Sequence, residues 1–403
     1  MTTEDIIHEL LAKANKCYES GNHADVVSLG KAALTYTDIP PILALQIRKL
    51  MIISCYYSKT PENQTLGKQL CNDLNWDWDL PWSDRWYGRI NLIWYTQKAD
   101  QVFADTKVKV IDWKPENNYN CMNPSICNYN GQLYMVIRTV NYDISYTENN
   151  HYYDMKDNDQ WIVRTRNYLA DFNDDLEITR IREILLPETL PPVAFPQVVG
   201  FEDMRLFECQ GDLWTSSTVR QLTPEGWHEI VVARIELKSD VAQLDDWWVV
   251  HPDHCEKAQE KNWMAAVKND ELFFIYNNDP VTVLDHAGHM IQQNKNARPF
   301  DNFRGGSPLL PFDDGYLTII HETSVYDYMP RHYTHRFVYY NTDFQIEQIS
   351  DLFYLYEKGI EFAAGMCWDN TNTRLLVSFG FKDRLAMIAD FDADAVRAGL
   401  MPV

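Results

Sequence analysis

The sequence contains the stretch Asn130-Gly-Gln-Leu-Tyr-Met-Val-Ile-Arg138, in which a turn is followed by β-forming residues and then by a cation. Four later stretches repeat the turn and the β-forming residues without the final cation: Gln210–Thr218, Asn269–Asn277, Asp314–Glu322 and Asn372–Gly380. Turn residues followed by β-branched and aromatic residues are typical of strands. From 130 to 210, 269, 314 and 372, the starts lie 80, 59, 45 and 58 residues apart. This irregular spacing indicates one repeated unit with loops of different length inserted.

Further β-like runs follow the copies, among them Trp161–Arg164, Glu229–Arg234 and Thr334–Tyr340. A β-propeller closes such a series without leaving long exposed edges. Five units therefore predict a mainly β, five-bladed propeller, and a double sandwich is the main alternative. In a propeller, the loops that enter the blades meet around the axis, so polar groups far apart in the sequence are expected to converge there.

The chain before about residue 105 has a helical period instead. Apolar residues recur at three- and four-residue spacing in three segments, Ile6–Ala14, Val26–Leu34 and Ile42–Tyr57. Turn residues at Gly21-Asn22 and Asp38–Pro41 separate them. This pattern resembles a degenerate tetratricopeptide-type stack, so we expect a TPR-like helical domain over 1–105 and a five-bladed propeller catalytic domain over 106–403. Such stacks bind a protein partner or support a neighbouring domain.

The composition excludes several classes of partner. The 403 residues include 36 Lys and Arg against 58 Asp and Glu, a formal net charge of −22. This acidity repels phosphate backbones and anionic lipids, so neither a nucleic acid nor a membrane surface is expected as partner. The sequence has no apolar run of about 18 residues and opens with early acids in a helical pattern, unlike a signal peptide. Eight scattered cysteines without a C-x-x-C pair indicate a reduced, cytoplasmic chain with mostly buried thiols.

Short polar motifs at the entries of the five units resemble those of a known family. In chain order they are Asn123-Pro124, Glu202-Asp203-Met204-Arg205, Lys261-Asn262, Gly315–His321 and Gly380-Phe-Lys-Asp383. They are similar to motifs of glycoside hydrolase family 130, the β-mannoside phosphorylases and mannosidases, and of the related β-mannosyltransferases of glycosyltransferase family 108. The similarity covers about residues 118–396 and rests on the order of five motifs. Met204 stands where the family has proline.

The resemblance implies an inverting enzyme in which a single acid, Asp203, handles the proton of the glycosidic oxygen. In the phosphorylases of the family this proton passes through a sugar hydroxyl. Phosphate then replaces the second carboxylate that an inverting hydrolase needs to activate water. Phe201 and Phe207 flank Asp203 and Glu202 is adjacent, so burial and a like charge are expected to raise its pKa. The alternative is a structural role, in which Asp203 pairs with Arg205 and fixes a strand.

The predicted site has one catalytic residue, Asp203, and a larger group of substrate-binding residues carried over by position. These are Asn123, Arg138, Glu202, Arg205, Lys261, Asn262, Trp263, Arg304, His321, Arg331, Arg336, Glu361 and Asp383. The cations are expected to face an anionic group, whereas Asn123 and Asp383 are expected to face sugar hydroxyls. Trp263 is expected to stack on a sugar ring, as aromatic side chains do.

One departure from the family bears on the reaction. Phosphorylases of the family end the third unit's strand with His-Arg-Pro, whereas this chain has Tyr276-Asn-Asn-Asp-Pro280, without a cation. The Arg304-Gly-Gly-Ser307 loop, Arg331 and Arg336 could still hold a phosphate or a nucleotide diphosphate.

Together with the helical module, this departure favours mannosyl transfer from GDP-mannose or mannose-1-phosphate to a mannose-containing glycan acceptor, which forms a β-mannoside. The alternatives are a β-mannoside phosphorylase or hydrolase of the same fold, and a non-enzymatic glycan-binding or scaffold propeller.

Other patterns are weaker. Asp77-Trp78-Asp79 has the D-x-D form of metal–nucleotide sites but lies in the helical part, where a solvated turn is the simpler interpretation. His251, His254 and Cys255, and likewise His286 and His289, have the spacing of metal ligands without a matching second pair. The sequence therefore predicts neither a metal ion nor a cofactor.

Overall fold

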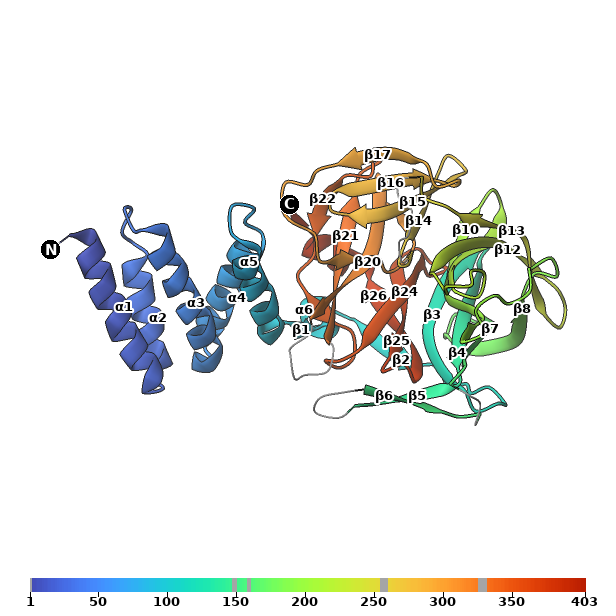
Figure 1. The fold of residues 1–403 in the computed structure, drawn as a ribbon, viewed down its shortest axis with the longest axis horizontal. Coiled ribbons are helices and arrows are strands. Elements are labelled where there is room, and N and C mark those ends of the chain that lie inside the picture. The colour runs from blue at the N-terminus through green and yellow to red at the C-terminus, as the bar shows by residue number, and fades with distance from the viewer. Residues whose placement is uncertain (1, 147–150, 158–160, 254–259, 325–331) are drawn as a thin grey trace. The chain divides into compact units, whose positions relative to one another are not determined.

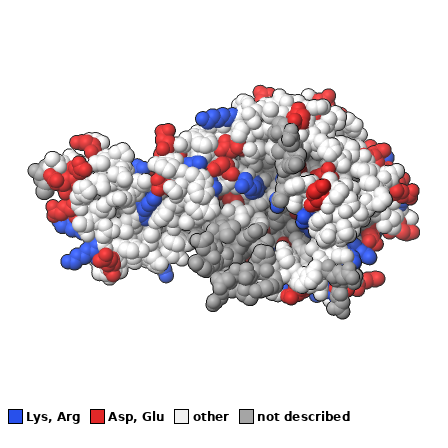
Figure 2. Space-filling view, in the orientation of Figure 1, with Lys and Arg blue, Asp and Glu red and all other residues white. Residues whose placement is uncertain are grey.

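The computed structural model describes residues 2–146, 151–157, 161–253, 260–324 and 332–403 (Figure 1). The chain divides into two compact units, Met1–Thr96 and Gln97–Val403. The first unit is helical and the second consists mostly of β-strands. No helix in the described part of the chain combines the length and the apolar character that a bilayer-spanning segment needs. Acidic side chains are spread over the face shown in Figure 2, with Lys and Arg side chains between them.

The N-terminal unit confirms the predicted helical region. Its helices are α1 (Thr3–Glu19), α2 (His23–Ala33), α3 (Pro41–Ser58), α4 (Pro61–Asn75) and α5 (Trp82–Leu92), followed by the 3₁₀ turn η1 (Ile93–Tyr95). Each helix packs on the next one along the chain. Thr2 and Asp5 form a capping box at the start of α1, and Pro41 and Pro61 occupy first-turn positions, where proline costs no hydrogen bond.

The C-terminal unit confirms the mostly β character predicted for it. Its larger antiparallel runs begin with β3 (Asn120–Tyr129), β4 (Gln132–Val140), β7 (Val163–Phe172) and β8 (Ile178–Leu185). They continue with β10 (Phe201–Cys209), β11 (Asp212–Val219), β12 (Glu229–Leu237) and β13 (Ala242–Val250). A parallel pairing of β13 with β8 joins these two runs into one sheet.

The remaining strands form further antiparallel runs. One consists of β14 (Met264–Lys268), β15 (Glu271–Asn278), β16 (Val281–Asp285) and β17 (Met290–Asn294). The next contains β18 (Phe303–Arg304), β19 (Leu310–Phe312), β20 (Gly315–Ser324), β21 (His332–Tyr340), β22 (Ile346–Ile349) and β23 (Phe353–Tyr354). The last contains β24 (Glu361–Trp368), β25 (Arg374–Phe381) and β26 (Leu385–Asp392), and β2 (Lys107–Val110) pairs with its outer strand.

Smaller elements complete the C-terminal unit. They are β1 (Gln97–Lys98), β9 (Val198–Val199), β27 (Met401–Pro402), the hairpin of β5 (Tyr142–Tyr146) and β6 (His151–Met155), and the helices α6 (Ala99–Val102) and α7 (Ala393–Gly399).

Six of the seven described cysteines are buried, as the sequence predicted for its thiols.

The repeated segments of the sequence correspond to β4, β11, β15, β20 and β25, each of which follows a tight turn. Asn130 and Gly131 both have positive φ values of 52° and 76°, which is the backbone of a hairpin turn that matches the twist of its strands. Because the turn precedes the repeated segment, a further strand lies before it in the first hairpin. Asn123 was expected in a loop and instead lies within this strand, β3.

Strands far apart in the sequence meet around the middle of the C-terminal unit (Figure 1). β3 contacts β10, β24 and β25, and β10 also contacts β14 and β24. Ser125 ties them together, because its hydroxyl donates to Ala364 O at 3.1 Å and accepts from Leu206 N at 2.9 Å. A Cβ at Gly365 would lie 2.7 Å from Ser125 Cα, so only glycine permits this approach. Four of the five predicted polar motifs lie on or beside these strands, and the fifth, Gly315–His321, lies on β20, which contacts β24.

Candidate active site

Two bulged strands bring Asp203 and Asn123 together. The register of β10 shifts between Glu202 and Arg205, and that of β3 shifts between Met122 and Ser125. At these points Asp203 and Asn123 have left-handed φ values of 50° and 41°, a conformation that Asp and Asn adopt more readily than most residues. Such bulges redirect a side chain out of the regular alternation of the strand. As a result, Asn123 Nδ2 donates to Asp203 Oδ1 at 2.8 Å.

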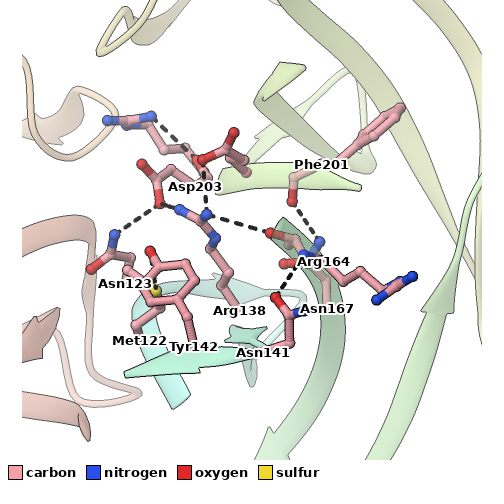
Figure 3. Close-up of polar contacts among 12 residues, drawn as sticks. Met122, Asn123, Arg138, Asn141, Tyr142, Arg164, Asn167, Phe201 and Asp203 are labelled. Atoms are coloured by element: carbon pink, nitrogen blue, oxygen red, sulfur yellow. Dashed lines mark hydrogen bonds and ion pairs between the residues drawn. The ribbon is translucent and has the colours of Figure 1, made fainter. Parts of the chain in front are cut away.

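Arg138, at the end of β4, links Asp203 to Glu202. Its Nη1 donates to Asp203 Oδ1 at 2.6 Å and its Nη2 donates to Glu202 Oε2 at 2.8 Å (Figure 3). The Arg138 side chain is 4% exposed, whereas those of Asp203 and Glu202 are 21% and 20% exposed. One buried guanidinium thus holds two carboxylates side by side and leaves part of each accessible to a ligand.

The expectation that the pKa of Asp203 is raised is wrong, because of the charged and polar groups around its carboxylate. Burial does raise the pKa of this carboxyl, but the positive charges of Arg138 and Arg205 and the hydrogen bond from Asn123 outweigh burial. The pKa of Asp203 therefore lies below its ordinary value of 3.8. Burial by itself would lower the pKa of Arg138, yet Asp203 and Glu202 raise it above the usual range. The pair is ionised at neutral pH.

Arg205 connects segments of three runs and adds its positive charge near Asp203. Its guanidinium donates to Gly306 O at 2.7 Å, to Asn262 Oδ1 at 3.1 Å and to the backbone oxygen of Asp203 at 3.2 Å. The side chain is 2% exposed. The structural alternative named Arg205 as the partner of Asp203, whereas the ion pair of the Asp203 carboxylate is formed by Arg138.

His321 and Arg304 lie opposite each other on β20 and β18. His321 is 4% exposed, and its pKa is far below the ordinary value because of burial and of the neighbouring His335, Arg205 and Arg304. The ring is therefore neutral, and its buried Nδ1 has no hydrogen-bond partner among the residues that the structure describes. Arg304 is exposed. His321 thus offers a hydrogen bond and no charge, whereas Arg304 is a cation open to solvent.

Lys261 and Asp383 are accessible residues in loops. Lys261 is exposed, and its neighbour Asn262 has a left-handed φ of 62° and accepts the hydrogen bond from Arg205. Asp383 lies in the turn after β25 with a φ of 52° and is half-buried. Burial is the main cause that raises the pKa of Tyr142, the charge of Arg138 lowers it, and Asp383 raises it again. Through Tyr142, Asp383 is electrostatically connected to the surroundings of Arg138.

The structure places three predicted binding residues in the protein core. Trp263 is 2% exposed, donates to Glu260 Oε2 at 2.9 Å and packs edge-on against Phe274, so no face of its ring is open to a sugar. Its expected stacking role is corrected by this burial. Arg336 is 1% exposed and its Nε donates to Glu322 Oε1 at 2.6 Å. Arg336 stabilises the β20–β21 pair, and its buried guanidinium does not present a cation to an anionic ligand.

Glu361 is the third such residue and is fully buried. Its carboxylate accepts hydrogen bonds from the backbone N–H groups of Leu355, Tyr356 and Glu357, at 2.6 to 2.9 Å. Burial raises the pKa of Glu361 to about 7, although these hydrogen bonds lower it. Glu361 therefore fixes the loop before β24 instead of binding substrate. Arg331 lies outside the described residues.

Two residues of β7 that sequence reasoning missed support the site. Thr165 Oγ1 accepts from Arg138 Nη2 at 3.3 Å, and Asn167 Nδ2 donates to Phe201 O at 2.8 Å, next to the bulge of β10. Figure 3 shows Asn167 reaching Phe201 beside Arg138. The β-like run Trp161–Arg164 gave a signal for the strand, but no sequence feature indicated that its next residues contact Arg138 and Phe201.

The weaker sequence motifs form a local turn and a local ion pair within the described residues. Asp77 Oδ1 accepts from Asp79 N at 2.9 Å, so the D-x-D forms its own turn. His289 pairs with Asp285 at 3.0 Å, whereas His254 and Cys255 lie outside the described residues. Within the described ranges, no group of three or more His, Cys, Asp and Glu residues is placed to hold a metal ion.

Comparison with known proteins finds similarity in the fold and none in the sequence families. No family model matches the sequence, and no curated protein matches it. A glycosyl hydrolase structure from Bacteroides ovatus is similar, with a TM-score of 0.51 and 14% identity, over 71% of this chain and 86% of that one. At this identity the likeness shows the fold alone.

Two further solved structures fall slightly below that level of similarity. A β-1,2-mannobiose phosphorylase from Listeria innocua has a TM-score of 0.49 and 12% identity, over 75% of this chain and 98% of that one. A GDP-Man-dependent mannosyltransferase from Leishmania mexicana has a TM-score of 0.44 and 9% identity, over 71% and 90%. The solved structures similar to this chain include a mannoside phosphorylase and a mannosyltransferase.

Proposed function

We propose that this chain is an inverting glycosyltransferase that moves a mannosyl residue to a glycan acceptor and forms a β-mannoside. In this proposal residues 106–403 are a five-bladed propeller whose first strands surround the site, and residues 1–105 are a TPR-like domain that holds a protein partner. The order of the five motifs supports mannose as the sugar. The fold shared with the Bacteroides ovatus glycosyl hydrolase supports a carbohydrate-active enzyme.

The observation that carries the proposal is the pair of contacts that hold Asp203 as a carboxylate. Its carboxylate is held by Asn123 and Arg138, and its pKa lies below 3.8, so it is a base at neutral pH. Phosphorolysis or hydrolysis by a single acid needs this group protonated at the start. Transfer to an acceptor needs it deprotonated, because the acceptor hydroxyl must lose a proton. The resting charge state therefore favours transfer.

The proposed step is a single displacement. The acceptor oxygen attacks the anomeric carbon while the bond from that carbon to the donor's phosphate oxygen breaks. The bonding electron pair leaves with the phosphate group. The acceptor proton passes to Asp203, directly or through a neighbouring sugar hydroxyl. Attack from the opposite face converts an α-linked donor into a β-mannoside.

The other residues have supporting roles in this step. The exposed cations Lys261 and Arg304 are proposed to stabilise the negative charge that develops on the departing phosphate. The neutral His321 and the half-buried Asp383 are proposed to bind sugar hydroxyls. Asn123 is proposed to bind a hydroxyl of the substrate through its buried carbonyl oxygen, which has no hydrogen-bond partner within the described ranges.

The choice of donor tests this function. The purified full chain is incubated with GDP-mannose or with mannose-1-phosphate, in each case with manno-oligosaccharide acceptors, and the products are separated by chromatography. We expect elongated acceptor and release of GDP or of phosphate. Cleavage of manno-oligosaccharides by phosphate or water, without elongation, would favour the phosphorylase or hydrolase. Glycan binding without any turnover would favour the non-enzymatic alternative.

The pH dependence of transfer follows from the lowered pKa of Asp203. Because the free enzyme loses this proton below pH 3.8, Asp203 is already a carboxylate throughout the neutral range. We expect kcat/KM for transfer to show no acidic limb from Asp203 between about pH 5 and pH 8. Initial rates at low donor concentration measure this profile. A tenfold fall for each unit of rising pH across that range would instead identify Asp203 as an acid.

A further inference from the structure

A concave feature lies near the proposed site along strand β3. It is a groove of about 510 Å³, lined by the link from β2 into β3, by Lys156 after the β5–β6 hairpin, and by the turn at Arg384–Ala386. The linking segment contributes Val110–Lys114 and Asn118–Cys121. None of the predicted site residues lines this groove. The proposed reaction therefore leaves its role open.

Strands β3 and β25 connect the groove with the surroundings of Asn123, the residue that holds Asp203. Asn120 of β3 lines the groove, and Asn123, three residues further along β3, holds Asp203. Because Asn123 lies in the bulge of β3, the regular strand spacing of roughly 10 Å for three residues is an upper limit for this separation. On the other side, a Cβ at Gly380 of β25 would lie 2.5 Å from Asn123 N, and the turn that follows β25 brings Arg384 into the groove wall. On both β3 and β25, the groove therefore begins within a few residues of Asn123 or of the glycine packed against it.

The lining offers the groups that recognise sugars. Trp113 is half-buried and packs on Tyr168 with ring centroids 4.9 Å apart, which fixes its indole. Tyr119 is anchored through its hydroxyl, which donates to Asp157 at 2.8 Å. Flat rings held in place bind the apolar face of a pyranose at little cost in conformational entropy. Lys114 is exposed and adds a hydrogen-bond donor for hydroxyl oxygens.

Charged neighbours shape this groove. Lys156 and Arg384 both pair with Asp143, at 3.6 Å and 3.0 Å, which ties the β5–β6 hairpin to the turn after β25. Lys156 also donates to Asn118 O at 2.9 Å and to Asn120 Oδ1 at 2.7 Å. These contacts hold the wall of the groove in one arrangement, so a ligand would meet a preformed surface.

We propose that this groove is an acceptor subsite that binds a distal neutral sugar residue of the glycan, with its ring stacked on Trp113. The inference rests on the proposed function, because it assigns to the groove the part of the acceptor that extends away from Asp203. The subsite makes the enzyme prefer longer acceptors. It acts in binding and takes no part in the proton transfer.

Binding measurements test the subsite separately from catalysis. Manno-oligosaccharides of two to five residues are titrated into the full chain and into its Trp113→Ala variant by calorimetry, without a donor. We expect affinity to rise with length in the parent chain. In W113A the affinity for the longest ligand should fall about tenfold, while that for the disaccharide stays unchanged. Trp82→Ala, which removes an exposed tryptophan from α5, is the matched control and should change neither affinity.

A second variant guards against loss of structure, since Trp113 packs on Tyr168. Lys114→Ala removes an exposed side chain and should weaken the longest ligand about threefold. Equal affinities for all lengths in the parent chain, or a length dependence that W113A and K114A both leave intact, would overturn the subsite even if mannosyl transfer is found. Weaker binding of GDP in W113A, with oligosaccharide affinity unchanged, would also overturn it and assign the groove to a nucleotide. Length-dependent binding by a chain without turnover would support the groove while rejecting the proposed function.

Discussion

Asp203→Asn is expected to lower kcat for mannosyl transfer by about 1000-fold, with little change in KM. Asparagine has nearly the same shape as aspartate and can still accept hydrogen bonds from Asn123 and Arg138, which now hold Asp203 at 2.8 Å and 2.6 Å. It cannot accept the acceptor's proton, and the loss of a positioned general base costs on the order of 100- to 10,000-fold. Steady-state rates with saturating donor, together with the melting temperature, measure the effect.

Glu202→Gln is the matched control for this variant. Glu202 is bound by the same guanidinium and its side chain is as exposed as that of Asp203, 20% against 21%. If Asp203 is the base, E202Q should cost no more than about tenfold in kcat, because it changes only the field around Arg138. Full turnover in D203N, or equal losses in both variants, would remove Asp203 from the mechanism.

The predicted strands follow from local chemistry. Turns such as Asn130-Gly131 require positive φ, and asparagine and glycine supply it, so the start of the next strand is encoded in a few neighbouring residues. The helices of the first unit are encoded just as locally, by apolar spacing, prolines and caps. The pairing between the runs, such as the parallel contact of β13 with β8, depends on distant residues and could not be derived from the sequence pattern.

The residue types of the candidate site could be predicted from sequence motifs, but the charges that surround Asp203 could not. Phe201, Phe207 and Glu202 are sequence neighbours of Asp203, and they suggested a raised pKa. Arg138 is 65 residues away from Asp203 in the sequence, and its contact reverses the direction of the shift. The burial of Trp263, Arg336 and Glu361 was equally hidden, because a motif gives the residue type but not the side of the strand that it faces.

The second prediction with a large effect is the replacement of Arg138. It is expected to change both the stability of the protein and the pH dependence of its activity. Arg138→Met keeps a long side chain of similar packing but removes the cation from a position that is 4% exposed. Removing one partner of a buried ion pair typically costs about 3–5 kcal/mol, because the remaining charge is left without compensation. Here two carboxylates, Asp203 and Glu202, lose the same partner. We expect a clearly lower melting temperature at neutral pH.

The variant should also change the pH profile. Without Arg138, burial and the adjacent Glu202 are expected to raise the pKa of Asp203 from below 3.8 towards neutrality. Because transfer needs the carboxylate, kcat/KM of R138M should acquire an acidic limb and fall as the pH drops through this raised value. The variant should regain stability relative to the parent chain as the pH falls and the carboxylates take up protons.

A double variant separates the charge effect from lost packing. Adding Glu202→Gln to R138M removes one of the two uncompensated carboxylates, so the double variant should be more stable than R138M alone. In the parent chain the same E202Q change removes a favourable partner of Arg138 and should not stabilise. This reversal of sign is the signature of coupling through the guanidinium. If E202Q has the same effect in both backgrounds, and the R138M profile keeps no acidic limb, Arg138 does not set the charge state of Asp203.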